Sequence, residues 1–335
     1  MSNELNQVAI AIGADGRGIL AADESTGTIQ KRFDSIGATC TEVSRRDYRE
    51  MLFQTDAMKE NISGVILYDE TIRQKGADGT SLVDIIKAAG SIPGIKVDKG
   101  AHALAGSPDE KITEGLDGLR GRLNEYYEIG ARFAKWRAVI EIGDTMPSST
   151  CVQANVHALA RYAALCQEAG IVPIVEPEIL MDGDHDVDIC FDVTEYVLKA
   201  LYDEMFSQNI LLEGSVLKPN MVISGQKCGV QASHDEVAEK TVRCLKRTVP
   251  AAVPSVVFLS GGQSDLDATA HLNAMNAGYD MTWNLSFSYG RALQAAPLKA
   301  WGGNNDNIPA AQAEFAHRAK MNGLATTGDW NKGLE

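Results

Sequence analysis

Short apolar runs alternate with longer segments of helical periodicity along nearly the whole chain. Each run is rich in β-prone residues and is followed, after a loop, by a segment whose apolar residues recur every three or four positions. Strand followed by helix, repeated about eight times, predicts parallel strands joined by right-handed crossovers. The runs that we expect to form strands are residues 18–23, 64–68, 94–98, 132–137, 172–176, 211–218, 256–260 and 282–287.

Eight such strand–helix units can close into a barrel. We therefore expect an α/β fold of the (β/α)₈ TIM-barrel type that forms a single domain over residues 1–335. A short helix is expected at the N-terminus and a helical tail over about 303–335. The alternative is a doubly wound open sheet, which normally carries a glycine-rich dinucleotide turn after its first strand. Residues 23–27 read Asp-Glu-Ser-Thr-Gly and lack the G-x-G-x-x-G spacing, so the barrel is favoured.

Helix starts can be recognised in several of the longer segments. Ser233 and Glu236 have the S-x-x-E spacing of a capping box. Ser44 and Ser264 are each followed three positions later by an aspartate, which would lie near the positive end of a helix dipole. Buried helix faces are expected at Val152, Val156, Leu159, Ala163 and Cys166, and at Val237, Thr241, Val242 and Leu245.

Composition narrows the function classes. The 335 residues include 31 Lys and Arg against 45 Asp and Glu, a formal net charge of −14, which disfavours binding to a nucleic-acid backbone. No apolar run approaches the ~20 residues of a membrane span, and residues 1–6 lack a basic and apolar leader, so we expect a cytoplasmic protein that does not bind membranes. The six scattered cysteines form no C-x-x-C pair and are expected to be reduced.

Ionisable residues lie at or near the carboxyl ends of the predicted strands, where barrel interiors normally hold branched aliphatic residues. Each one alone could reach solvent or form a stabilising ion pair. Together they would converge on the face where barrel enzymes carry their active sites, which favours a shared site. The residues are Asp23, Lys96, Asp98, Lys135, Arg137, Glu176 and Lys218.

Lys218 ends the apolar run 211–218 and is followed by Pro219, which cannot continue a strand ladder. We expect burial, helped by a second cation such as Lys135, to lower the pKa of this lysine. A free amine at neutral pH is what Schiff-base formation with a carbonyl requires. The competing interpretation is a surface lysine, which the preceding Ser-Val-Leu disfavours.

Two parts of the chain have the features of phosphate sites. Residues 260–262 (Ser-Gly-Gly) follow the seventh run and residues 288–291 (Ser-Tyr-Gly-Arg) follow the eighth, where barrels often bind phosphate through backbone N–H groups. Residues 24–28, with Lys31 and Arg32 after them, offer hydroxyls and cations after the first run. A substrate with two phosphates would use both parts, although residues 24–28 are equally compatible with a plain helix start.

No metal site is expected. The six histidines include no H-E-x-x-H or H-x-x-E-H pair, and residues 182–186 (Asp-Gly-Asp-His-Asp) lack the spacing and the closing glutamate of a calcium loop. We interpret residues 182–186 as a solvated loop and expect a reaction that needs neither a metal nor another cofactor.

From about residue 18 to about residue 303 the chain resembles the class I, Schiff-base-forming fructose-1,6-bisphosphate aldolases. The most specific element is LLEGSVLKPN at residues 211–220, which is similar to the family signature around the imine lysine. The resemblance implies a TIM-barrel lyase of glycolysis and gluconeogenesis, a cytoplasmic homotetramer that reversibly cleaves fructose 1,6-bisphosphate into dihydroxyacetone phosphate and glyceraldehyde 3-phosphate. The other segments that resemble family motifs, in the family's order, are residues 18–27, 94–100, 133–137, 170–180, 258–264 and 287–294.

The resemblance also implies a role for each matching residue. Lys218 would attack the ketone C2, Glu176 would move protons during dehydration of the carbinolamine, and Asp23 would accept the C4 hydroxyl proton. Lys135 would place a positive charge beside the imine, and Glu178 would support the cation network. Contacts to substrate are implied for Lys96, Arg137 and Ser288, to the C6 phosphate for Ser25 and Thr28, and to the C1 phosphate for Ser260, Gly261, Gly262, Gly290 and Arg291.

Animal members of the family end in a tyrosine that assists proton exchange at the enamine, whereas the last tyrosine here is Tyr289. The resemblance therefore leaves open which group protonates the enamine. Two other interpretations are a different Schiff-base sugar-phosphate enzyme, such as a transaldolase or a deoxyribose-phosphate aldolase, and a non-catalytic scaffold or binding module. The first needs only one phosphate site, and the second does not need Lys218.

Overall fold

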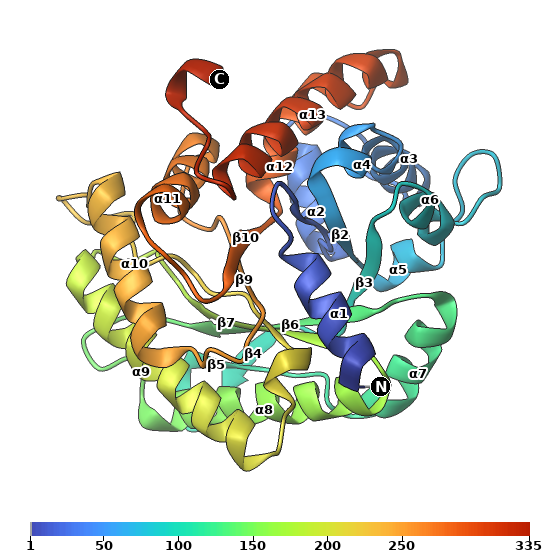
Figure 1. Ribbon diagram of the computed structural model, residues 1–335. Coiled ribbons are helices and arrows are strands. Elements are labelled where there is room, and N and C mark those ends of the chain that lie inside the picture. The colour runs from blue at the N-terminus through green and yellow to red at the C-terminus, as the bar shows by residue number, and fades with distance from the viewer. Residues whose placement is uncertain (1) are drawn as a thin grey trace.

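The computed structural model describes residues 2–335, and its central element is a closed barrel of parallel strands (Figure 1). The strands follow one another around the barrel in chain order, and the last pairs with the first. This closure confirms the (β/α)₈ barrel and excludes the open sheet. The barrel strands are β1 (Gly18–Ala22), β2 (Ile62–Leu67), β3 (Ile92–Lys96), β6 (Phe133–Ile140), β7 (Val172–Ile179), β8 (Val216–Leu217), β9 (Ser255–Phe258) and β10 (Asn284–Tyr289).

Helices surround the barrel and connect its strands (Figure 1). They are α1 (Ser2–Ile12), α2 (Thr26–Asp34), α3 (Glu42–Phe53), α4 (Ala57–Asn61), α5 (Asp69–Ile72), α6 (Leu82–Ala88), α7 (Leu119–Ile129), α8 (Ser149–Glu168), α9 (Val187–Ser207), α10 (His234–Thr248), α11 (Asp265–Gly278), α12 (Arg291–Trp301) and α13 (Ile308–Ala325). Three short 3₁₀ turns are η1 (Leu212–Gly214), η2 (Asn305–Asn307) and η3 (Lys332–Leu334). An antiparallel hairpin that the sequence pattern did not predict, β4 (Ala101–Leu104) and β5 (Ser107–Thr113), lies between β3 and β6.

Helix α1 covers the amino-terminal end of the barrel (Figure 1). Its buried residues Leu5, Ala9 and Ile12 belong to one apolar cluster with side chains from inside the barrel, including Phe133. The barrel also hydrogen-bonds to this helix, because the hydroxyl of Ser255 donates to the carbonyl of Ala9 over 2.9 Å. The amino-terminal half of the barrel is therefore filled with apolar side chains and closed by a helix.

The inward-facing side of several strands changes from apolar to charged toward the carboxyl end. Successive side chains of a strand alternate between its two faces, so residues two apart share a face. Apolar residues of each series belong to the barrel cluster, and the charged residues that follow line a cavity. The series are Ile19, Ala21 and Asp23; Phe133, Lys135 and Arg137; Ile174, Glu176 and Glu178; and Val216 and Lys218.

The run 211–218 is only partly a strand, contrary to the prediction. It forms the 3₁₀ turn η1 and then the two-residue strand β8. The side chain of Gln167 supplies hydrogen-bond partners for backbone groups that would have paired with a neighbouring strand in a longer β-strand. Its amide nitrogen donates to the carbonyls of Leu211 (2.7 Å) and Gly214 (3.1 Å), and its oxygen accepts from the Leu211 N–H (3.0 Å).

The predicted helix start at Ser44 is wrong, whereas those at Ser233 and Ser264 are confirmed. Helix α3 is capped three residues earlier by Thr41, whose side chain accepts from the Ser44 N–H while Ser44 Oγ accepts from the Thr41 N–H. This reciprocal pair satisfies two backbone donors, so the helix begins at Glu42. The side chains of Ser233 and Ser264 each accept the hydrogen bond expected of an N-cap. Both predicted helix faces are buried, on α8 and α10.

A pair of glycine substitutions tests the packing inside the barrel. A Cβ at Gly94 would lie 2.3 Å from ring atoms of the fully buried Phe133, so Gly94→Ala should lower the free energy of unfolding by roughly 1–3 kcal/mol through overpacking. The matched control is Gly121→Ala on α7, where nothing lies within 4 Å of a new Cβ; it should raise stability by up to about 1 kcal/mol. Denaturant unfolding measures both changes, and a neutral Gly94→Ala would contradict this packing.

Candidate active site

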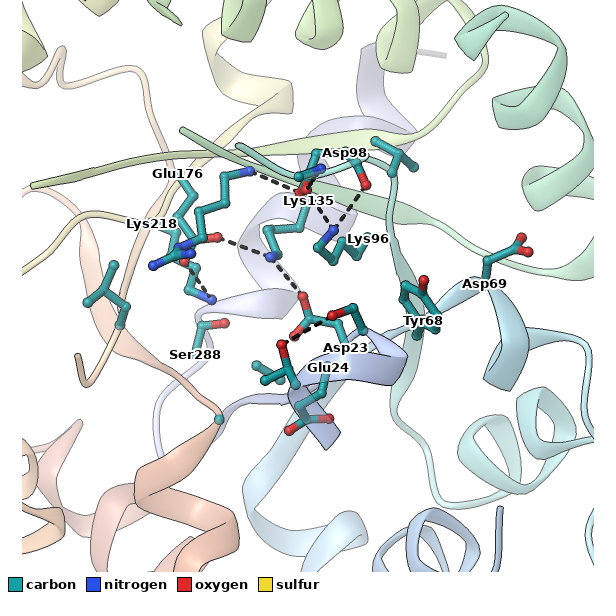
Figure 2. Close-up of a pocket in the computed structure, with 18 of the residues that line it drawn as sticks. Asp23, Glu24, Tyr68, Asp69, Lys96, Asp98, Lys135, Glu176, Lys218 and Ser288 are labelled. Atoms are coloured by element: carbon teal, nitrogen blue, oxygen red, sulfur yellow. Dashed lines mark hydrogen bonds and ion pairs between the residues drawn. The ribbon is translucent and has the colours of Figure 1, made fainter. Parts of the chain in front are cut away.

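A cavity of about 940 Å³ opens at the carboxyl end of the barrel (Figure 2). Every site residue that the family resemblance implies lines this cavity except Gly262, whereas Lys31, considered with residues 24–28, is exposed and does not line it. Gly262 lies in the adjacent turn after β9 with a φ of +74°, and it borders a neighbouring depression with Gln263 and Arg291. Ser288, expected in a loop, is instead part of strand β10. The site thus draws on loops and strand ends far apart in the sequence.

Two lysines and two carboxylates form a chain of ion pairs at the centre of the cavity (Figure 2). Lys218 Nζ lies 3.1 Å from Glu176 Oε1, and Lys135 Nζ lies 3.3 Å from Glu176 Oε2. Lys135 also lies 2.7 Å from Asp23 Oδ2. The side chains of Lys218, Lys135 and Glu176 are each only 4–5% exposed. Glu176 is therefore shared by two amines, and a proton can pass between it and Lys218 without leaving the site.

Burial and neighbouring charges act in opposite directions on the pKa values of these ion-paired groups. Burial acts to raise the pKa of Asp23, but the positive charges of Lys135, Lys218 and Lys96 outweigh it and lower that pKa well below its ordinary value. The pKa of Glu176 is likewise lowered, because Lys135, Lys218 and Arg137 outweigh the effect of burial. The pKa of Lys135 is raised against burial by the carboxylates of Asp23, Glu176 and Asp98. The amine of Lys135 is therefore a fixed positive charge beside Lys218.

A second group of charges continues along the cavity wall (Figure 2). Arg137 pairs with Glu178, and Lys96 Nζ lies 2.6 Å from Asp98 Oδ1. Asp98 is buried and also accepts from the backbone N–H of Arg137 over 3.3 Å. The pKa of Arg137 is raised, since burial is outweighed by the charges of Glu178, Glu176 and Asp98. Asp98 thus holds the Lys96 amine in position and also fixes the backbone of β6 at Arg137.

One end of the cavity is formed by the loops after β9 and β10. Ser260 and Gly261 line it with Gly290 and Arg291, where helix α12 begins. The Arg291 guanidinium donates to the Gln263 carbonyl over 2.7 Å, which holds it against the loop after β9. Backbone donors, a helix N-terminus and a guanidinium together make a receptor for an anion.

The loop after β1 forms a second polar wall. Ser25 is the N-cap residue of α2, and its hydroxyl lies 3.1 Å from that of Thr28 one turn later. Ser25 makes no side-chain capping bond, so its hydroxyl is available to a ligand. Arg32, on the same helix, pairs with the buried Glu24 at 2.5 Å and also lines the cavity. This wall therefore offers two hydroxyls and one cation.

Several cavity residues were missed by the prediction. Asp98 is not one of them, because it belongs to the strand-end charges predicted to share the site, and Glu24 and Arg32 belong to the segment considered for phosphate. Arg73 and Arg122 carried no comparable signal, because they lie in or directly after helices and reach the cavity only through the fold. Other missed lining residues are Tyr68, Asp69, Lys99, Glu125 and Tyr126.

Within residues 2–335, no three His, Cys, Asp or Glu side chains come together in a group that could hold a metal ion. No helix in the same range is both long enough and apolar enough to cross a bilayer.

A buried lysine that shares a carboxylate with a second amine, in a barrel cavity with polar and cationic walls, has the features of a barrel enzyme that forms a Schiff base. A family model described as class I fructose-bisphosphate aldolase matches residues 4–335. The chain belongs to this family. Its reaction is the reversible aldol cleavage of fructose 1,6-bisphosphate through a lysine Schiff base, a step of glycolysis.

Known fructose-bisphosphate aldolases are similar to this chain over nearly its whole length. A probable class 1 fructose-bisphosphate aldolase of Xanthomonas axonopodis pv. citri is 58% identical, covering 98% of both chains. Two aldolases of Arabidopsis thaliana named cytosolic are each 55% identical over 98% of this chain, and cover 84% and 91% of their own lengths. A solved structure of fructose-bisphosphate aldolase from Plasmodium falciparum, in complex with TRAP and a small-molecule inhibitor, superposes with a TM-score of 0.98 at 46% identity, covering 99% of this chain and 96% of that one.

Replacing the central amine tests the electrostatics of the site. Lys135→Met removes the positive charge that lowers the pKa values of Asp23 and Glu176, so burial should raise both. These carboxyls would then keep their protons to higher pH, and the acid limb of the kcat/KM profile should move upward by roughly one to three pH units. Lys135→Arg keeps the charge and serves as the control. An acid limb that stays in place in Lys135→Met would contradict the pairing.

Proposed function

We propose that Lys218 is the nucleophile of the aldol reaction and that the charges around it supply its acid and base catalysis. The observation that carries the proposal is the shared carboxylate of Glu176, 3.1 Å from the Lys218 amine and 3.3 Å from the Lys135 amine. An amine that has passed its proton to Glu176 can attack the C2 carbonyl. Glu176 then returns a proton to the leaving hydroxyl of the carbinolamine, which departs as water and leaves a protonated imine.

Asp23 is the base for carbon–carbon cleavage in this proposal. Its lowered pKa keeps it ionised at neutral pH, so it can accept the C4 hydroxyl proton. As that proton leaves, a carbonyl forms at C4, the C3–C4 bond breaks and its electrons enter the protonated imine to give an enamine. Lys135, 2.7 Å from Asp23, keeps a positive charge beside both reacting groups. Glu178 pairs with Arg137 at the cavity wall and holds that cation toward the sugar chain.

Two phosphate sites hold the open-chain substrate across these groups. Ser260, Gly261, Gly290 and Arg291 bind the C1 phosphate, with Gly262 shaping the turn. Ser25 and Thr28, with Arg32 beside them, bind the C6 phosphate, and Lys96 contacts the sugar hydroxyls between. Ser288, whose buried Oγ has no partner among the residues that the structure describes, accepts or donates a hydrogen bond at the C1 end. Binding energy from both phosphates is thereby used to orient the reacting carbons.

Two polar walls also separate this function from its alternatives. A transaldolase or a deoxyribose-phosphate aldolase needs one phosphate site and would leave the wall at Ser25 and Thr28 without a ligand. A scaffold needs no nucleophile. We also infer a cytoplasmic location, which the relatives named cytosolic support, and a homotetramer, which the family resemblance supports.

Reductive trapping tests the nucleophile. Sodium borohydride with fructose 1,6-bisphosphate should attach the three-carbon or six-carbon adduct to Lys218, read by peptide mass spectrometry. Lys218→Met should lower kcat by roughly 10⁴-fold or more, because no other group replaces a lost nucleophile. Lys135→Met serves as the control for a lost amine and should still be trapped at position 218. An adduct on a different lysine would overturn the assignment.

One substitution in each proposed phosphate site tests the assignment of the two sites. Arg291→Ala should weaken the binding of dihydroxyacetone phosphate by roughly 10- to 100-fold, the effect of losing a charge-assisted pair, and change glyceraldehyde 3-phosphate binding less. Thr28→Val should show the reverse preference, with a smaller effect. Product-inhibition constants measure both, and equal losses for the two products in each variant would refute the assignment.

A further inference from the structure

The turn that carries Gly261 and Gly262 is held at both of its ends. The Gln263 N–H donates to the Ser260 carbonyl over 3.3 Å, which closes the turn, and Gly262 has the left-handed φ of +74° that glycine allows. Arg291 donates to the Gln263 carbonyl over 2.7 Å and lies 3.5 Å from that of Ser260. The orientation of the backbone N–H groups and the position of the guanidinium therefore depend on the same four-residue turn.

The side chain of Gln263 has one hydrogen-bond partner among the described residues. Its Oε1 lies 2.6 Å from Nδ1 of His271, two turns into α11, while its Nε2 is buried without a partner. Both residues are only 6% exposed. The His271 bond is thus the polar contact that fixes the buried Gln263 side chain, and with it the last residue of the turn.

The surroundings of His271 keep its ring neutral and fixed in orientation. Burial, followed by the charge of His234, lowers the pKa of His271 to about 4. Because an amide oxygen only accepts, Nδ1 carries the single ring proton and donates it to Gln263. The ring of His234 packs edge-on at 4.8 Å, and His234 Nε2 lies 2.9 Å from Asp267 Oδ1.

We propose that His271 is a positioning residue for the C1-phosphate site, holding Gln263 so that the turn and Arg291 present their donors together. The proposal rests on the phosphate role of Arg291 proposed above. His271 itself touches neither substrate nor Lys218. Its loss should therefore weaken phosphate binding without slowing the bond-breaking steps, since the ion pairs around Lys218 lie on other strands.

Two substitutions of His271 in the full chain test this role. His271→Leu removes the donor and should raise both the KM for fructose 1,6-bisphosphate and the inhibition constant of dihydroxyacetone phosphate roughly three- to ten-fold, the value of one buried hydrogen bond. The kcat should stay within about two-fold of the original. His271→Asn should restore both constants, because its side-chain N–H₂ branches from the same position as Nδ1. A fall in kcat with unchanged KM would overturn the proposal, as would failure of asparagine to rescue.

A matched variant separates positioning from loss of helix stability. Thr269 lies on α11, as His271 does. Thr269→Val removes its hydrogen bonds to Asn322 and Arg318 of α13 and does not touch Gln263. It should lower the Tm and leave the KM unchanged, and a rise in KM equal to that of His271→Leu would refute a specific role. Arg291→Ala is measured alongside. If it leaves binding intact, the proposed phosphate site fails; if it weakens binding while His271→Leu does not, only the positioning role fails.

Discussion

Four charges at the carboxyl end of the barrel, on Asp23, Lys135, Glu176 and Lys218, can be buried only because they are buried together. An isolated ion in a protein interior costs several kcal/mol, and here each charge lies within 3.3 Å of one of opposite sign. Two amines balance two carboxylates. A proton that moves from Lys218 to Glu176 replaces an ion pair by a neutral pair and leaves the total charge of the group unchanged. The same balance that makes the group stable thus lets it exchange protons.

The fold and the centre of the site could be predicted because both leave local signals. Strands appear as short apolar runs, and a charge at the end of an inward-facing series marks the cavity, as with Phe133, Lys135 and Arg137. Part of what failed depends on contacts distant in sequence, because the turn η1 is satisfied by Gln167, some 44 positions away. The start of α3 failed for a local reason: Thr41 and Ser44 are both suitable caps, and their reciprocal bond makes Thr41 the cap. Arg73 and Arg122 have no local pattern that distinguishes them from surface arginines.

A buried network links the two walls that face the substrate. Gln294, on α12, donates to the Ala21 carbonyl and to Glu24 Oε1, each over 2.8 Å. Arg49, on α3, donates to the Glu24 carbonyl over 3.0 Å. The loop after β1 and the start of α12 are therefore parts of one hydrogen-bonded unit. For the two phosphate sites proposed above, this unit fixes their separation before a ligand arrives, which lowers the entropy lost on binding.

Helix α1 determines at which end of the barrel molecules enter and leave the cavity. Because it closes the amino-terminal end, water and ligands reach Lys218 from the opposite mouth. In the mechanism proposed above, a fragment joined covalently to Lys218 stays in the depth of the cavity, while the aldehyde released by cleavage diffuses out. Cleavage accordingly favours departure of the aldehyde first, and condensation favours arrival of the ketone first. Because helix α1 closes the other end, the aldehyde enters and leaves by the carboxyl-end mouth, past the groups that hold the remaining fragment.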